Sequence, residues 1–350
     1  MLENGVVPDA VGEGEYEAAA AEFGRAVDHR ILELILLPTE DCNFRCVYCY
    51  EDFTIGKMPR VVVDAVKKLL SRRAPKLRNL ILNWFGGEPL VARDIVESIS
   101  KTALDLSNHF GFSYMGSMTT NGALLQSRAA KRLVDLGVRQ YQISLDGWRE
   151  GHDQTRRRRN GKGSFERIWK NILDINESKM DINIILRLHV TKNNVESIEK
   201  LIYNICNCLS PKRFRIFIKA IEDLGGSSIS QSDILFDDVF EKRAALNYLK
   251  TLSSKFNQYE NSRQEQITFS PCYAAKLNSF VIRADGRIGK CTVALKDRRN
   301  VIGRLREDGT MEIRPDLIAL WARGWERFDR AALHCPLDGL PEMRMWKGNR

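Results

Sequence analysis

The sequence predicts an α/β fold, in which six parallel strands, each followed by a helix, form a partial (β/α)6 TIM-like barrel with a small α+β domain after it. Three observations lead to this prediction. The chain of 350 residues is too long for one ordinary core, strand-like runs alternate with helical runs, and polar motifs follow the strand-like runs. Strands joined through helices run parallel, and β/α barrels build their active sites at the carboxyl ends of the strands.

The alternation of strand-like and helical runs repeats six times. Each strand-like run and the helical run after it pair as follows: 31–39 with 61–73, 77–85 with 91–110, 112–122 with 127–137, 138–147 with 164–178, 182–190 with 194–209, and 214–221 with 237–256. Around residue 260 the pattern changes to a hairpin, with an Asp-Gly turn between two apolar strands. We therefore expect an acidic arm at 1–30 with one helix over 15–28, a barrel at 31–261 and a small domain at 262–350.

The net charge of +9 is unevenly distributed. The first 30 residues carry seven acidic and two basic side chains, which sum to −5, so the remaining chain carries +14. A basic surface attracts an acidic peptide, an anionic cofactor or a nucleic acid, and composition alone does not choose among them. No apolar run reaches the roughly 18 residues that span a bilayer, and the N-terminus lacks the regions of a secretory signal. We therefore expect a cytoplasmic protein that does not use a membrane.

The stretch DCNFRCVYCYE places three cysteines directly after the first strand, with the spacing C-x3-C-x2-C: Cys42, Cys46 and Cys49. Thiolates bind iron–sulfur clusters and zinc. On a four-iron cubane, three thiolates leave one iron open for a small molecule. A zinc site needs a fourth ligand, for which His29 and His152 are the candidates. A ferredoxin-like electron carrier is a further alternative.

The stretch CNFRCVYCY resembles the signature of the radical S-adenosylmethionine (SAM) superfamily, and GGEP (86–89), TTNG (119–122) and ISLDG (143–147) follow in the order of that family. The resemblance implies a [4Fe–4S] cluster on Cys42, Cys46 and Cys49, with SAM chelated to its open iron. Glycines at 86 and 87 suit a close approach of the backbone to a ligand. The resemblance implies SAM contacts from these residues: Tyr48, Gly86, Gly87, Glu88, Pro89, Asn121, Ser144 and Arg156.

A second set of cysteines lies in the small domain. The segment from Cys272 to Cys291 resembles the start of a SPASM/twitch domain, the auxiliary cluster domain of radical SAM peptide-modifying enzymes. A full SPASM domain continues with five further cysteines, whereas this chain has Cys335 alone. The resemblance therefore implies one auxiliary [4Fe–4S] cluster on Cys272, Cys291 and Cys335. A domain without a cluster, or with a zinc ion, is the alternative.

The resemblance also implies an activity: reductive cleavage of SAM to a 5′-deoxyadenosyl radical, which removes a hydrogen atom from the substrate. A SPASM-like extension implies a ribosomally made precursor peptide, with leader and core, as substrate, and flavodoxin or ferredoxin as reductant. The run TEDCNFRCVYCYEDFTIGKM resembles maturases that crosslink side chains as cyclophanes. Alternatives are a peptide epimerase or other peptide oxidase, and a catalytically silent binding protein. Nucleic acid is not expected as a partner.

No catalytic residue follows from these motifs, and three are candidates. Cys335 would donate a hydrogen atom in an epimerase if it is not a cluster ligand. His189 would be either a core histidine or an acid/base group in the barrel. Asp285 is expected to form a turn, with a general base as the alternative.

Three other features have structural interpretations. Arg156–Arg159 is expected to be a solvated loop with Arg156 directed at SAM, or a docking site for an acidic leader. Cys206 and Cys208 are expected to be buried structural residues, because they point about 200° apart on a helix and do not share a metal. Trp321 and Trp325, one helical turn apart, are expected to form a packing stripe.

Overall fold

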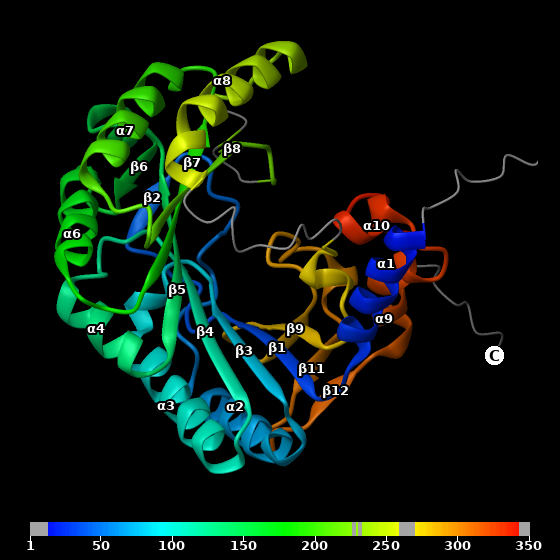
Figure 1. Cartoon of the computed structure of the whole chain (residues 1–350). Coiled ribbons are helices and arrows are strands. Elements are labelled where there is room, and N and C mark those ends of the chain that lie inside the picture. The colour runs from blue at the N-terminus through cyan, green and yellow to red at the C-terminus, as the bar shows by residue number, and fades with distance from the viewer. Residues whose placement is uncertain (1–12, 226–228, 230–232, 259–269, 343–350) are drawn as a thin grey trace, which may run out of the picture.

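A computed structural model of the protein describes residues 13–225, 229, 233–258 and 270–342. Six parallel strands stand side by side in chain order, and helices cover their outer face (Figure 1). The strands are β1 (Ile31–Leu36), β3 (Asn79–Trp84), β4 (Ser113–Thr120), β5 (Val138–Leu145), β7 (Asn183–Val190) and β8 (Phe214–Ala220). The helices that follow them are α2 (Arg60–Arg73), α3 (Arg93–Phe110), α4 (Ser127–Asp135), α6 (Phe165–Glu177), α7 (Val195–Cys208) and α8 (Val239–Asn257). The predicted partial (β/α)6 barrel is therefore confirmed.

The strands alternate between two faces. On β7, Ile184, Leu186, Leu188 and Val190 are buried, whereas the residues between them are only partly covered. Successive side chains of a strand point to opposite faces, so the buried set packs against the helices and the other set lines the inside of the barrel. In the described part of the chain, no helix is both long and apolar enough to cross a bilayer.

The C-terminal part extends the sheet of the barrel. Strand β9 (Ser279–Ile282) pairs in parallel with β1, with Glu33 opposite Ser279. The antiparallel strands β10 (Arg287–Gly289), β11 (Gly303–Leu305) and β12 (Met311–Ile313) continue from β9. The predicted hairpin exists as β9 and β10, with Gly286 at φ 83° in its turn. Because the sheet is shared, the strand before the first cysteine loop lies next to a strand of the C-terminal part.

The helices at the two chain ends pack together beside this extension (Figure 1). They are α1 (Glu13–Val27), α9 (Pro315–Ala322) and α10 (Arg330–His334). Elsewhere in the described residues, short 3-10 helices are η1 (Ala74–Lys76), η2 (Pro89–Ala92), η5 (Tyr273–Ala275), η6 (Arg298–Asn300) and η7 (Arg323–Trp325). Trp321 is fully buried, and the ring of Trp325 packs against that of Phe23 on α1, with 5.3 Å between the ring centres. These contacts support the packing interpretation of both tryptophans. Residues 1–12 of the expected acidic arm, and the expected domain boundary at 261/262, lie outside the described residues.

Two local predictions are wrong. Residues 156–158 form strand β6 (Arg156–Arg158), which pairs with β2 (Phe44–Cys46) of the cysteine loop, and are therefore not a loop, although Arg157 and Arg159 are exposed as expected. The helix α5 (Glu150–Thr155) leads into it. Cys206 and Cys208 are exposed, because they lie on either side of the face that α7 buries, which is formed by Ile198, Leu201, Ile202 and Ile205.

A buried ion pair links the barrel to the C-terminal part. Arg283, after β9, donates through Nε to Glu40 Oε1 at 3.0 Å and through Nη2 to Oε2 at 2.5 Å. Both side chains are more than nine-tenths buried, and Arg283 Nη1 also donates to the Leu295 carbonyl. Glu40 lies two residues before Cys42, so this pair holds the start of the cysteine loop against the C-terminal part.

Replacement of Glu40 by alanine is expected to lower the free energy of unfolding by about 3 kcal/mol, because Arg283 would remain buried without a counter-charge. Urea unfolding under anaerobic conditions measures this. Asp105→Ala is the matched control: it removes an exposed i,i+4 partner of Lys101 on α3 and should cost less than about 0.5 kcal/mol. Equal losses in the two variants would contradict the prediction.

Candidate cluster and cofactor site

The first cysteine trio lies on the loop after β1, at the carboxyl end of the barrel. Cys42 is buried, and Cys46 and Cys49 are half-buried. The backbone N–H of Phe44 donates to Cys42 Sγ at 3.3 Å. Burial raises the pKa of all three thiols, that of Cys49 to about 12. Without a metal the thiols stay protonated, and a bound cluster would supply the positive charge that stabilises the thiolates.

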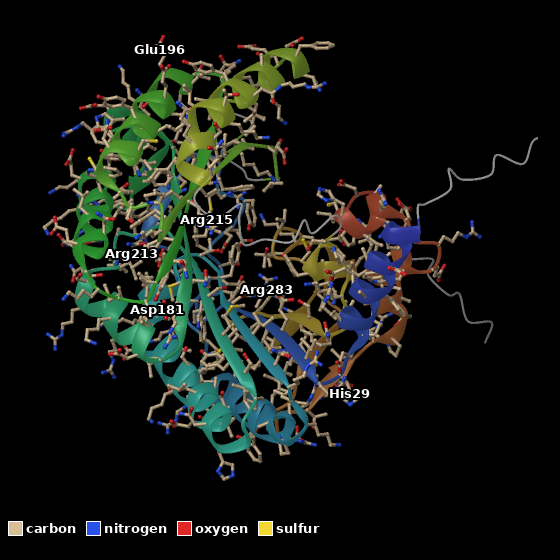
Figure 2. All side chains as sticks on the ribbon, viewed as in Figure 1. His29, Asp181, Glu196, Arg213, Arg215 and Arg283 are labelled. Atoms are coloured by element: carbon tan, nitrogen blue, oxygen red, sulfur yellow. The ribbon has the colours of Figure 1, made fainter. Side chains whose placement is uncertain are left out.

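The arrangement fits a cluster better than a single metal ion. Among the described residues, no three His, Cys, Asp or Glu side chains are close enough to hold one ion. A cubane, by contrast, holds its thiolates at separate corners. Neither candidate for the fourth zinc ligand is available. His29 precedes the start of β1, at the opposite end of the strand (Figure 2). His152 accepts from the Asp146 N–H at Nδ1, and its Nε2 lies 3.0 Å from Ser164 Oγ.

The two glycines of GGEP serve the packing of this loop. A Cβ on Gly86, which has φ 110°, would lie 2.3 Å from the Thr39 carbonyl, and one on Gly87 would lie 2.3 Å from the Asp41 carbonyl. Their missing side chains therefore allow a close approach to the backbone that leads into Cys42. The predicted contact of these glycines with SAM stays a prediction.

Glu88 joins two of the motif loops. It is fully buried, and its carboxylate accepts from the Leu90 N–H, from Thr120 Oγ1 at 2.8 Å and from the Asn121 N–H at 2.7 Å. Burial raises its pKa, and these hydrogen bonds oppose the rise. Pro89 begins η2 directly after it. In the structure Glu88 is thus an internal tie between the second and third strand ends, and its predicted contact with SAM remains untested.

Asn121 brings a donor to the first cysteine. Its Nδ2 lies 3.9 Å from Cys42 Sγ and donates to Asn43 Oδ1 at 2.8 Å, while its Oδ1 accepts from the Ala123 N–H. The side chain is held on both sides. Asn121 is therefore placed to tune a sulfur of a bound cluster, since hydrogen bonds to cluster sulfurs shift its potential.

A buried polar network lies beneath Tyr48. Its hydroxyl donates to Asp146, with distances of 2.7 and 3.0 Å to the two oxygens, and accepts from Arg156 Nη1 at 2.6 Å. His189 Nδ1 lies 3.2 Å from Asp146 Oδ1, and Thr155 Oγ1 donates to Oδ2. Burial alone would raise the pKa of Asp146, but the charge of Arg156 and the hydrogen bond from His189 hold it well below its usual range.

Sequence reasoning missed Asp146, although it is part of the ISLDG motif directly after β5. The network explains why that position is acidic: among the described residues, Asp146 is the carboxylate that pairs with buried Arg156, at 4.0 Å. Arg156 Nε is itself buried without a hydrogen-bond partner in the described structure. An unpartnered guanidinium N–H at this place fits an anionic group such as the SAM carboxylate. Ser144 lies on β5, opposite Arg187 of β7, and its predicted contact with SAM stays a prediction.

The three catalytic candidates lie in different surroundings. His189 belongs to the Tyr48–Asp146 network, and burial lowers its pKa. Asp285 accepts from the Arg287 N–H at 3.1 Å and from Arg287 Nε at 2.6 Å, in the turn between β9 and β10. These contacts support the turn-forming interpretation of Asp285. Cys335 follows α10 and is half-buried.

The second cysteine trio comes together in the C-terminal part. Burial raises the pKa of Cys272, and Cys291 and Cys335 raise it further, so each of them lies within electrostatic reach of Cys272, although among the described residues no three such side chains are close enough to hold a single ion. The Cys272 N–H donates to the Leu333 carbonyl, which fixes it against the helix before Cys335. Asn300 holds Cys291 by accepting from its N–H and donating to its carbonyl.

Two tyrosines lie between the two trios. Tyr50 and Tyr273 pack on a small apolar cluster formed by Ile35, Leu37, Val281 and Leu295. The pKa of Tyr50 is raised mainly by burial, and also by Glu51, Tyr273 and one cysteine of each trio, Cys49 and Cys291. Tyr50 therefore lies within electrostatic reach of one cysteine of each trio, beside a small apolar cluster.

Comparisons with known proteins agree with this geometry. Residues 36–202 match the family model of the Radical SAM superfamily. The chain is 37% identical over 131 residues to a GTP 3′,8-cyclase of Rhodopseudomonas palustris, covering 35% of this chain and 34% of that protein. It is 29% identical over 184 residues to a cysteine-type anaerobic sulfatase-maturating enzyme of Clostridium novyi, covering 49% and 46%. The chain thus spans between about a third and a half of these relatives.

Solved structures extend the likeness to the C-terminal part. Native anSMEcpe with bound AdoMet superposes with a TM-score of 0.61 at 20% identity, covering 82% of this chain and 83% of that one. Streptococcus suis SuiB bound to precursor peptide SuiA gives a TM-score of 0.56 at 16% identity, covering 98% of this chain and 79% of SuiB. At these identities the likeness shows the fold, and the fold includes the segment after the barrel.

Proposed function

We propose that this protein is a radical SAM enzyme that modifies a ribosomally made precursor peptide, most simply by a side-chain crosslink of the cyclophane type, because residues 36–202 match the family model of the Radical SAM superfamily. The observation that carries the proposal is the placement of the first cysteine trio beside the Tyr48–Asp146–Arg156 network, with Cys46 paired to Arg156 across β2 and β6. SuiB, which resembles this chain in fold, binds a precursor peptide.

When bound, the reduced cluster and SAM supply a 5′-deoxyadenosyl radical, which takes a hydrogen atom from the substrate. Cys42, Cys46 and Cys49 would hold the cluster, and Asn121 would donate toward the sulfur of Cys42. Arg156 and Ser144 would bind the carboxylate of SAM, and Asp146 fixes Tyr48 and Arg156 in position. The inner face of the barrel would shield the radical from water.

A crosslink requires one further electron and one proton to leave the substrate after the new bond forms. An auxiliary [4Fe–4S] cluster on Cys272, Cys291 and Cys335 would accept that electron, and the mutual proximity of these thiols supports such a site. The same proximity favours a ligand role for Cys335 over that of a lone hydrogen donor, and therefore a crosslink over an epimerisation. Flavodoxin or ferredoxin would supply the first electron.

Two other activities are weaker candidates. Sulfatase-maturating enzymes carry an acidic residue directly after the cysteine that matches Cys291, whereas this chain has Thr292, whose hydroxyl lies 2.8 Å from Tyr273 OH. The GTP 3′,8-cyclase match covers 35% of the chain, so it gives no support for a nucleotide substrate from the C-terminal part.

The proposal predicts that anaerobically reconstituted protein forms 5′-deoxyadenosine from SAM and dithionite. Co-expression with each short reading frame next to the gene should yield one peptide that has lost the mass of two hydrogen atoms, with a new bond located by tandem mass spectrometry. An epimerase would leave the peptide mass unchanged. A protein that holds its cluster but forms no 5′-deoxyadenosine would instead be a catalytically silent binding protein.

A further inference from the structure

Arg187 lies on the inner face of the barrel, on β7. Its Cα partners across the sheet are Ser144 on β5 and Phe217 on β8, and its guanidinium carbon lies 6.0 Å from the centre of the Phe217 ring. The alternation of the strand directs Arg187 inward, in the same column of side chains as His189. Arg187 precedes His189 by two residues on this strand, so it lies deeper in the barrel than the Tyr48–Asp146 network, to which His189 belongs.

Among the described residues, no carboxylate neutralises the charge of Arg187. Its Nε is buried and has no hydrogen-bond acceptor among the described residues, and no ion pair joins it to a described carboxylate. Burial lowers its pKa, Tyr48 and Tyr50 oppose this shift, and the charge of Arg156 adds to it. Glu222, the acidic residue in its surroundings, is paired with Lys219 and Lys242, each at 3.4 Å. A half-buried cation without a partner is costly, so it indicates a group that an anionic ligand completes.

The apolar side chains around Arg187 are also uncovered. Phe217 is 47% exposed and Ile185 is 38% exposed, although both belong to the inward-facing set of their strands. Large apolar side chains on the wall of a barrel are normally covered by neighbours or by a ligand. The inner face here therefore combines Arg187 with two apolar surfaces, and Arg215 of β8 lies opposite Ile185.

We infer that Arg187, Phe217 and Ile185 form a substrate subsite that binds a carboxylate of the precursor peptide, flanked by an apolar side chain of the same peptide. The inference rests on the proposed function and adds to it a feature of the substrate. The resemblance implies that Arg156 and Ser144 bind the SAM carboxylate, and on that basis we assign Arg187, which lies opposite Ser144, to a second anion. The excess charge of +14 outside the first 30 residues favours an acidic segment as its source.

The first test is the stability of the ligand-free protein. Arg187→Met removes an unpaired charge and keeps the length of the side chain, so its Tm is expected to rise above that of the wild type. The control is Arg139→Met, on β5, which breaks the exposed pair of Arg139 Nη1 with Asp181 at 3.0 Å (Figure 2) and should leave Tm nearly unchanged. A fall in the Tm of Arg187→Met would show that the arginine has a structural partner and would overturn the inference.

The second test uses the reconstituted, SAM-loaded protein and two labelled hexapeptides, acetyl-Gly-Phe-Glu-Gly-Phe-Gly-amide and its counterpart with Gln in place of Glu. Fluorescence anisotropy is expected to show about tenfold tighter binding of the Glu peptide to the wild type, because a charge-assisted hydrogen bond contributes that much. Arg187→Met should lose this preference, and Arg139→Met should keep it.

Two results of the second test would overturn the inference. One is equal affinity of the wild type for the two peptides. The other is a roughly tenfold rise in the Kd of SAM in Arg187→Met, which would assign the guanidinium to the carboxylate of SAM. Formation of 5′-deoxyadenosine without peptide, measured on the same preparations, reports the proposed activity separately from the subsite.

Discussion

Replacement of Cys42, Cys46 and Cys49 by alanine is expected to abolish the formation of 5′-deoxyadenosine and to remove the iron of one cluster. These three thiols lie on the loop at the carboxyl end of β1, beside Asn121 and the Tyr48 network, where a cluster would meet SAM. Thiolates are the ligands of such clusters, and no other cysteine of the described chain lies on this loop.

The triple alanine variant of Cys272, Cys291 and Cys335 is the matched comparison, because its substitutions remove the same number of buried or half-buried thiols. If both clusters form, the wild type should hold about eight irons, and alanine variants of either trio should each hold about four. The variant of Cys272, Cys291 and Cys335 should retain formation of 5′-deoxyadenosine but not the peptide product. Alanine at the exposed Cys206 and Cys208 should change neither the iron content nor the formation of 5′-deoxyadenosine.

Two outcomes of this experiment would contradict the assignment. Activity in the first triple variant would show that another group binds SAM. A wild type with about four irons, unchanged when the second trio is replaced, would leave the C-terminal part without a cluster. In that case the second electron of a crosslink would need another acceptor.

The barrel and the first cysteine site could be predicted from the sequence because their signals are local. Each strand–helix pair has its own apolar periodicity, and each polar motif directly follows a strand. The spacing of Cys42, Cys46 and Cys49 lies within eight residues, so no long-range contact was needed to recognise it. The hairpin after residue 278 was predictable for the same reason, from its Asp285–Gly286 turn.

The remaining features depend on contacts between distant parts of the chain. The pairing of β9 with β1 joins residues almost 250 positions apart, and the Glu40–Arg283 pair depends on it. Nothing in the local sequence around Arg156 indicates that it pairs with Cys46 across β2 and β6. Glu88 is a second example. Its motif implies a contact with SAM, but the three protein groups that donate hydrogen bonds to its carboxylate can be identified only from the fold.

The exposure of Cys206 and Cys208 has a related cause. The stretch around them is apolar enough to indicate a buried helix, but a helix buries only the stripe that meets its neighbours. On α7 that stripe consists of isoleucines and a leucine at helical spacing, and both cysteines fall outside it. The helical spacing of the apolar residues in α7 therefore predicts which side chains are buried, whereas the apolar composition of the stretch does not.

The replacement of Asp146 by asparagine is expected to have the largest effect on stability, a loss of about 4–5 kcal/mol, because it leaves Arg156 buried without a counter-charge. The same change removes a charged acceptor from Tyr48 and from Thr155. Urea unfolding of cluster-free protein at pH 7 measures the loss. The control is Asp135→Asn, which weakens an exposed i,i+4 pair with Lys131 on α4 and should cost less than about 0.5 kcal/mol.

The pH dependence of wild-type stability tests the same network. Burial lowers the pKa of His152 to about 4, below the unfolded value of about 6.5, so the unfolded state binds more protons and stability falls as the pH drops through this window. The pKa of Asp146 is also lowered, so its contribution is fully present above the unfolded value of about 3.9 and is lost only as the pH falls further, through the folded pKa. The deficit of Asp146→Asn should therefore be present in full at pH 7 to 8. A deficit no larger than that of Asp135→Asn at this pH would show that Asp146 does not hold Arg156 and Tyr48 in place.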